Sequence, residues 1–352
     1  QISKGAGSVS AGMEALTGQV NIELRKPETA DRLFVNGYMN QTGRYELNTN
    51  IAYKIGNIES LLLTHGSMWK YTLDDNQDSF RDMPETRQIN LLQRWSYQHS
   101  SGYENKTGIQ VMYESSLGSI VSVSFHDQTG WFGSRQYHGK QNSVYANLIF
   151  QTNLANKQHI LKTGANFLYD DYNEKLNEQA FLRQEIVPGI WAEHHWKLPL
   201  FQLISGVRLD YHNWFGMILT PRVNGKWDVS SSGTFRFSAG RGFRTPNILA
   251  ENPAVFLSNR QIFFPENHLT NTSQFSVRPE IAWNYGVNFT QNFMIGEREG
   301  SVTADLYRTD FERVLILNQE TGDRLSFESV NRGAFANAFQ IESKLEVLKG
   351  LE

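Results

Sequence analysis

The stretch Ile281–Gln291, with the sequence IAWNYGVNFTQ, carries the clearest structural pattern in the chain. Every second side chain is apolar or aromatic: Ile281, Trp283, Tyr285, Val287 and Phe289. The residues between them are small or polar. A helix would spread these rings around its axis, whereas successive side chains of a β-strand point to opposite faces. The stretch therefore predicts a strand with one apolar and one polar face.

The same alternation recurs along the chain and predicts fourteen strands, at 31–41, 44–55, 57–70, 86–98, 103–114, 142–153, 158–171, 188–198, 200–212, 219–229, 233–241, 280–293, 300–316 and 335–348. Short turns alternate with long segments, which lie at 71–85, 115–141, 172–187, 242–279 and 317–334. Short turns on one side and long loops on the other are typical of an outer-membrane barrel. We therefore expect an all-β fold, an antiparallel up-and-down transmembrane β-barrel segment.

Composition narrows the class of protein further. Aromatic residues make up 12% of the 352 residues, yet no run approaches the ~20 apolar residues of a membrane-spanning helix. Rings near strand ends suit the aromatic girdles of a membrane barrel. The alternative is a soluble β-sandwich or propeller, which usually has shorter strands and polar outer faces.

Charge and cysteine content exclude several functions. The chain has 33 Lys and Arg against 36 Asp and Glu, so it offers no basic surface that predicts nucleic-acid binding. Without cysteine it has no disulfide, zinc-thiolate site or thiol nucleophile. The sequence shows no Ser-His-Asp spacing, phosphate-binding loop or metalloprotease motif. We therefore expect a protein that is not an enzyme.

Two groups of motifs carry a family resemblance. Near the start, Lys4–Ser10 reads KGAGSVS and Thr17–Asn21 reads TGQVN. Later, Gly240–Asn247 reads GRGFRTPN and Ala250–Pro253 reads AENP. In this order and spacing they resemble the end of the plug domain and the barrel signature of TonB-dependent outer-membrane receptors, and the resemblance covers essentially the whole chain.

The resemblance implies a domain organisation. Residues 1–27 would be the C-terminal end of the plug, with Lys26 and Pro27 as the hinge, and residues 28–352 would be transmembrane β-barrel. Such barrels have about 22 strands. The fourteen strands would thus be part of a barrel, and we expect the chain to be a piece of a longer receptor whose plug mostly precedes Gln1.

The resemblance also implies a function in the outer membrane. Members import a scarce solute, such as a ferric siderophore or cobalamin, by energy-coupled active transport. The implied partners are the extracellular ligand, outer-membrane lipid and the energy-coupling TonB complex, which binds a plug region expected outside this chain. Two alternatives remain: a glycan importer of the same fold that works with a surface lipoprotein, and a soluble β-sheet binding protein.

An acidic segment, Asp74–Glu85, has the ligand spacing of an EF-hand calcium loop. Oxygen-bearing side chains occupy positions 1, 3, 5, 9 and 12, and the residue at position 7 offers its backbone carbonyl: Asp74, Asn76, Asp78, Asp82, Glu85 and, by its carbonyl, Phe80. Position 6 is Ser79 rather than the usual glycine, and the flanks are expected strands. The segment is either a Ca²⁺ site that orders an outer loop or a solvated acidic loop.

The segment 115–141 is a candidate for substrate binding, through Trp131, Tyr137 and His138. Aromatic rings mixed with polar groups suit a siderophore or a sugar. The alternative is girdle aromatics with polar loop residues.

The barrel signature supplies a structural motif: Arg241, Gly242, Phe243, Arg244 and Pro246. We expect the two arginines to have interior guanidinium groups. These would anchor the long loop or touch the plug, or else pair with interior Asp or Glu across strands.

Overall fold

The computed structural model describes residues 2–346, apart from 5, 15–17, 21–24, 70–84, 100–103, 120–135, 155–157, 177–178, 253–254, 256–257, 259, 265–276 and 297. Its described part contains two short 3₁₀ turns, η1 (Val9–Ala11) and η2 (Pro27–Thr29). No helix in these described ranges is long and apolar enough to cross a membrane.

Strands make up most of the structure. A small sheet pairs β1 (Ile2–Lys4) with β2 (Gly18–Val20). The other strands form one sheet of sixteen, in chain order β3 (Leu33–Met39), β4 (Arg44–Ile55), β5 (Ile58–Trp69), β6 (Glu85–Gln98), β7 (Glu104–Ser119), β8 (Gln136–Leu154), β9 (His159–Leu176), β10 (Gln179–Lys197), β11 (Phe201–His212), β12 (Gly216–Asp228), β13 (Gly233–Arg244), β14 (Gln261–Phe263), β15 (Glu280–Ile295), β16 (Arg298–Asn318), β17 (Arg324–Asn331) and β18 (Phe335–Leu345).

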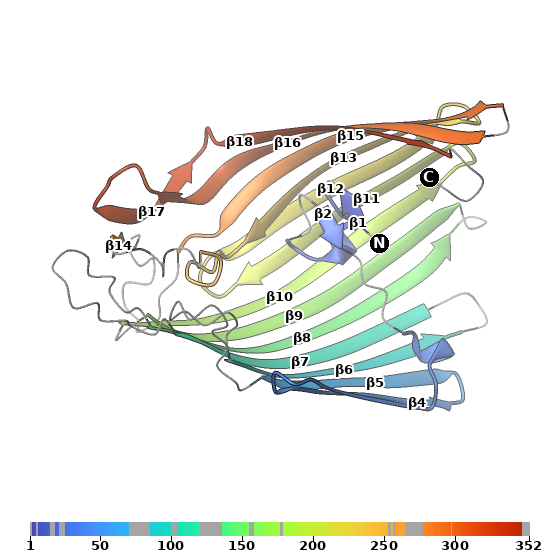
Figure 1. Cartoon of the computed structure of the whole chain (residues 1–352). Coiled ribbons are helices and arrows are strands. Elements are labelled where there is room, and N and C mark those ends of the chain that lie inside the picture. The colour runs from blue at the N-terminus through green and yellow to red at the C-terminus, as the bar shows by residue number, and fades with distance from the viewer. Residues whose placement is uncertain are drawn as a thin grey trace.

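The large sheet is an antiparallel meander that curves into a deep trough (Figure 1). Both β17 and β18 pair with β16, and they are separated by Arg332 and Gly333, whose φ angles of 64° and 90° break the strand. When β17 and β18 are taken as one interrupted strand and the short β14 is left out, the meander has the fourteen strands that the sequence predicts. The sequence pattern does not predict β14, which is not part of the meander and pairs in parallel with β17.

Several strands are longer than their sequence pattern indicates. The expected loop 172–187 is mostly the paired ends of β9 and β10, and β16 and β17 extend into the expected loop 317–334. The ends of β7 and β8 pair within 115–141. Polar residues on both faces, as at Asn173, Glu174 and Lys175, remove the alternation on which the prediction depends.

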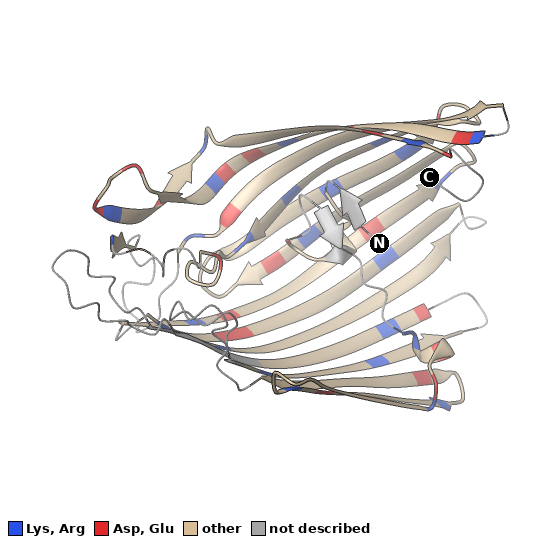
Figure 2. Ribbon diagram, in the orientation of Figure 1, with Lys and Arg blue, Asp and Glu red and all other residues tan. Residues whose placement is uncertain are grey.

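The two faces of the sheet differ as a membrane barrel requires. On β12 the outward side chains of Met217 and Leu219 are 75% and 49% exposed, whereas Ile218, Thr220 and Arg222, which alternate to the other face, are buried. Exposed apolar residues continue along the convex face, while charged residues recur on the strands all round the sheet (Figure 2). The convex face thus suits lipid and the concave face suits a wet lumen.

Candidate functional site

Charged pairs line the concave face of the sheet. Arg208 and Asp210 are two residues apart on β11, so strand alternation places both on one face. The guanidinium donates from Nε and Nη2 to the two carboxylate oxygens at 2.7 Å, and both side chains are buried. On β10, Arg183 Nε lies 3.0 Å from Glu185 Oε1, which is an ion contact without the paired hydrogen bonds of Arg208 and Asp210. Each pair neutralises its own charge within the wall, which limits the cost of burying it.

The N-terminal residues 6–14 lie against this wall, on the concave side of the sheet (Figure 1). Val9 is fully buried. The close approach depends on two glycines, because a Cβ at Gly206 would lie 2.5 Å from Val9 Cγ2, and one at Gly240 would lie 2.9 Å from the Cβ of Ala6. The glycines therefore act as recesses that receive the N-terminal residues.

Arg222 on β12 holds the same segment through its backbone. Its guanidinium donates to the carbonyl oxygens of Ser8 at 3.0 Å and Met13 at 2.7 Å. A third bond reaches the carbonyl of Arg241 at 3.3 Å. One planar side chain thus joins β12 to both ends of η1, because five fixed donors can serve several acceptors at once.

Glu14, at the end of this segment, lies near charged side chains on the lumen side of the sheet. Its side chain keeps contact with water, yet surrounding protein desolvates the carboxyl and raises its pKa. Arg244 opposes that shift, and three carboxylates add to it: Glu185, Asp170 and Glu251. Protonation of Glu14 is therefore favoured in this position compared with free solution.

The segment after β13 folds inward across the loop-side end of the trough. Arg183 donates to the carbonyl oxygen of Pro246 at 3.0 Å, and its guanidinium lies 4.2 Å from the centre of the Tyr172 ring. Ile248 packs with Leu325 and other residues near β17, whereas Leu249 packs with apolar residues of β9 and β10. The segment thus bridges opposite walls of the lumen.

The two signature arginines differ in position. Arg244 lies on the lumen side and pairs with Glu280 and Glu251 at 2.7 Å each, so it fixes the start of the inward segment. Arg241 pairs with Glu312, which also accepts a hydrogen bond from Trp283 at 3.0 Å. Because Gly240 faces the lumen, alternation directs Arg241 to the outer face, so the expectation of an interior guanidinium is wrong for Arg241.

The remaining motif residues have simpler surroundings. Phe243 is buried in an apolar cluster with Val187 and Ile218. Gly242 is opposite Ala282 in the β13–β15 register.

Most of the sequence-predicted binding residues lie outside the described residues. This holds for Asp74, Asn76, Asp78, Phe80, Asp82 and Trp131. Glu85 is the first residue of β6. Tyr137 and His138 belong to β8, where they are paired with Gly118 and Leu117 of β7. Among the residues that the structure does describe, no three His, Cys, Asp or Glu side chains gather as a metal site.

The lumen residues that hold the N-terminal segment were not singled out by the sequence motifs. A usable signal exists, because a charged residue followed two positions later by its opposite marks one strand face. The pattern occurs at Arg183 and Glu185, at Arg208 and Asp210, and at Lys226 and Asp228, which pair at 2.9 Å. Arg222 has no such neighbour, and no local pattern identifies it.

Comparison with known proteins identifies the architecture. The family described as TonB dependent receptor-like, beta-barrel matches residues 24–352. The iron-regulated outer membrane virulence protein of Vibrio cholerae is 28% identical over 113 residues, which span 30% of this chain and 17% of that protein.

Solved structures show the same fold. The siderophore receptor PirA from Pseudomonas aeruginosa superposes with a TM-score of 0.54 at 15% identity, over 98% of this chain and 68% of that one. The copper transporter OprC gives 0.60 at 12% identity, over 98% and 63%. The family match covers nearly all of the sheet described above, and members of this family are outer-membrane transporters rather than enzymes. The chain therefore belongs to the TonB-dependent receptor-like β-barrel family and lies in the outer membrane.

Proposed function

We propose that this chain forms the barrel wall of a receptor that imports a ferric siderophore by energy-coupled transport. The observation that carries the proposal is the fixation of residues 6–14 on the lumen wall by Arg222 and two glycine recesses. A segment of the chain that is fixed inside the lumen narrows the path of a large solute, and we infer that passage requires work. We assign that work to the TonB energy-coupling complex, acting through the N-terminal side of the chain.

The cargo assignment has separate support. The Vibrio cholerae relative is iron-regulated, and PirA is a siderophore receptor. A ferric siderophore brings its own iron ligands, so recognition requires contacts to an organic surface rather than a metal site. We propose that Trp131, Tyr137 and His138 make such contacts, because Tyr137 and His138 lie at the loop-side end of β8.

The decisive experiment measures uptake by cells in which the full gene is deleted and then restored. The probes are ⁵⁵Fe complexed with catecholate and hydroxamate siderophores, labelled cobalamin, copper ions and a labelled oligosaccharide. We expect deletion to abolish uptake of one ferric siderophore, and restoration to recover it only where the energy-coupling complex is intact.

The other outcomes distinguish the alternatives. Loss of oligosaccharide uptake alone would favour the glycan importer and overturn the iron assignment. Recovery without the energy-coupling complex would overturn active transport. The soluble β-sheet alternative is excluded by the family and the outer-membrane location.

A further inference from the structure

A hollow of about 510 Å³ lies on the lipid-facing side of β3 to β6. One row across the four strands lines it with Gly37, Leu47, Gly66 and Ile89, and the adjacent row, whose side chains alternate to the other face, lines it with Tyr38, Glu46, Ser67 and Gln88. A Cβ added at Gly37 or Gly66 would meet no atom within 4 Å. The two glycines therefore leave empty space on both sides of Leu47.

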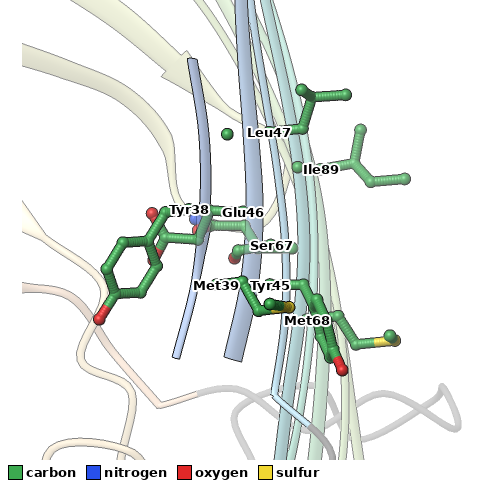
Figure 3. A pocket seen from close by; sticks show the side chains of 11 residues that line it. Tyr38, Met39, Tyr45, Glu46, Leu47, Ser67, Met68 and Ile89 are labelled. Carbon is green, nitrogen blue, oxygen red and sulfur yellow. The ribbon is translucent and has the colours of Figure 1, made fainter. Parts of the chain in front are cut away.

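The side chains that flank the hollow on the convex face are apolar. Met39, Tyr45 and Met68 form the next row of that face toward the loop side, and all three are exposed. Figure 3 views this part of the sheet nearly edge-on, with Leu47, Ile89 and Met68 projecting to the side opposite Tyr38. The hollow is thus open to the surroundings of the barrel rather than to its lumen.

The row of Met39, Tyr45 and Met68 continues onto β6 with a positively charged residue, Arg87. Arg87 is directly opposite Met68, is exposed, and lies two residues from the start of β6. Because Met68 is the penultimate residue of β5, this row lies near the loop-side ends of the strands. Below the hollow, the outer face continues as an apolar band through Val35 and Leu91.

We propose that this hollow binds one acyl chain of a phosphate-bearing membrane lipid, with its phosphate against Arg87. The hollow is continuous with the lipid-facing surface of an outer-membrane protein, so an acyl chain is the occupant already present there. A chain seated over the glycines gains dispersion contacts with the side chains that flank them, in addition to those it makes on a smooth wall. The guanidinium fork matches a phosphate in both charge and geometry.

The test uses the intact protein purified from membranes, with bound lipid counted by native mass spectrometry. The probes are phosphatidylglycerol and a phosphate-free galactolipid with the same acyl chains. Gly66→Leu fills the hollow and Arg87→Gln removes the charge. The matched controls are Ala146→Leu, which places the same side chain on the outer face of β8, and Arg298→Gln, at the turn-side end of β16.

The unaltered protein should retain one phosphatidylglycerol under conditions that strip the remaining lipid. Gly66→Leu should lower occupancy by both lipids roughly fivefold or more, whereas Arg87→Gln should remove the preference for the phosphate-bearing lipid. Unchanged occupancy in Gly66→Leu, or equal losses in Ala146→Leu, would overturn the acyl-chain site. An unchanged preference in Arg87→Gln, or an equal loss of preference in Arg298→Gln, would overturn the role of Arg87.

Discussion

At the scale of single residues, Arg222 joins the N-terminal segment to the wall through two hydrogen bonds. Replacement by alanine leaves the carbonyls of Ser8 and Met13 without their donor. An unsatisfied buried group costs about 1–3 kcal/mol, so hydrogen exchange of residues 6–14 should accelerate roughly tenfold or more. Arg236→Ala is the control, since Arg236 is also on the lumen side but bonds Asn288. Equal acceleration in both variants would contradict a specific role for Arg222.

Glu14 makes the docking of the same segment depend on pH. Its pKa is raised in the docked state, because desolvation and neighbouring carboxylates outweigh the opposing effect of Arg244. The docked state therefore holds a proton more tightly than the released state. Docking should be strongest below the usual pKa of 4.5 and weaken as pH rises through the raised value.

Hydrogen exchange of residues 6–14 between pH 4 and pH 8, corrected for intrinsic rates, measures this effect. Glu14→Gln should dock at least as well at pH 8 and lose most of the pH dependence, whereas Glu320→Gln, on a distant turn, should keep it. A Glu14→Gln protein with undiminished pH dependence would assign the effect to other groups.

The acidic segment Asp74–Glu85 stays a prediction that substitutions can decide. If it binds Ca²⁺, the double change Asp74→Ala and Asp78→Ala should abolish calcium heat in titration calorimetry. Ser79→Gly should tighten binding by about fivefold, because a non-glycine residue in a left-handed conformation costs about 1 kcal/mol. A solvated loop would instead give no calcium heat in the unaltered protein.

At the scale of elements, the sequence predicts strands well where membrane and lumen impose different chemistry on the two faces. On β15 the alternation of apolar and small or polar residues is unbroken from Ile281 to Thr290, and the expected range 280–293 differs from Glu280–Ile295 only at its end. Where β9 and β10 extend into the expected loop 172–187, polar residues occupy both faces and the contrast disappears. The inward course of the segment after β13 depends on contacts such as Arg183 with Pro246, which no local pattern encodes.

The candidate site divides in the same way. Arg244 was identifiable from the GRGFRTPN motif, because the motif lies where a strand becomes a long loop. Arg222 was not, because its importance comes from carbonyls more than 200 positions away in the chain. Opposite charges two residues apart are intermediate between Arg244 and Arg222. The local sequence shows that they share one strand face, but their burial depends on residues distant in the chain.

Strand β11 offers a test of whether its glycine is required for docking. Valine favours strands intrinsically, so Gly206→Val should stabilise an unobstructed strand. Here its Cβ would meet Val9 at 2.5 Å, and overpacking typically costs about 1–3 kcal/mol. We expect proteinase K to cleave within residues 6–14 faster in this variant. Gly66→Val, which has open space on the outer face, should cleave at the unaltered rate.

At the scale of the whole molecule, the two faces of the sheet make opposite demands on a charged side chain. Val287, near the middle of β15, is exposed on the convex face, and its neighbour Asn288 points into the lumen and donates to Asp305 at 2.7 Å. An arginine at position 287 would lie in hydrocarbon, where the cost is about 2–4 kcal/mol at the bilayer midplane. An arginine at position 288 could pair with Asp305.

Denaturant unfolding from phospholipid vesicles measures this difference as a free energy of unfolding. Val287→Arg should lower the free energy of unfolding by most of the midplane cost. Asn288→Arg should lower it less, because pairing with Asp305 offsets the loss of the hydrogen bond that Asn288 accepts from Arg236. Met217→Arg, exposed at the loop-side end of β12, should cost at most about 1 kcal/mol, because the penalty falls toward the interface. Equal losses at positions 287 and 288 would contradict the assignment of the convex face to lipid. Equal losses at 287 and 217 would contradict the depth assignment, since the penalty depends on distance from the bilayer centre.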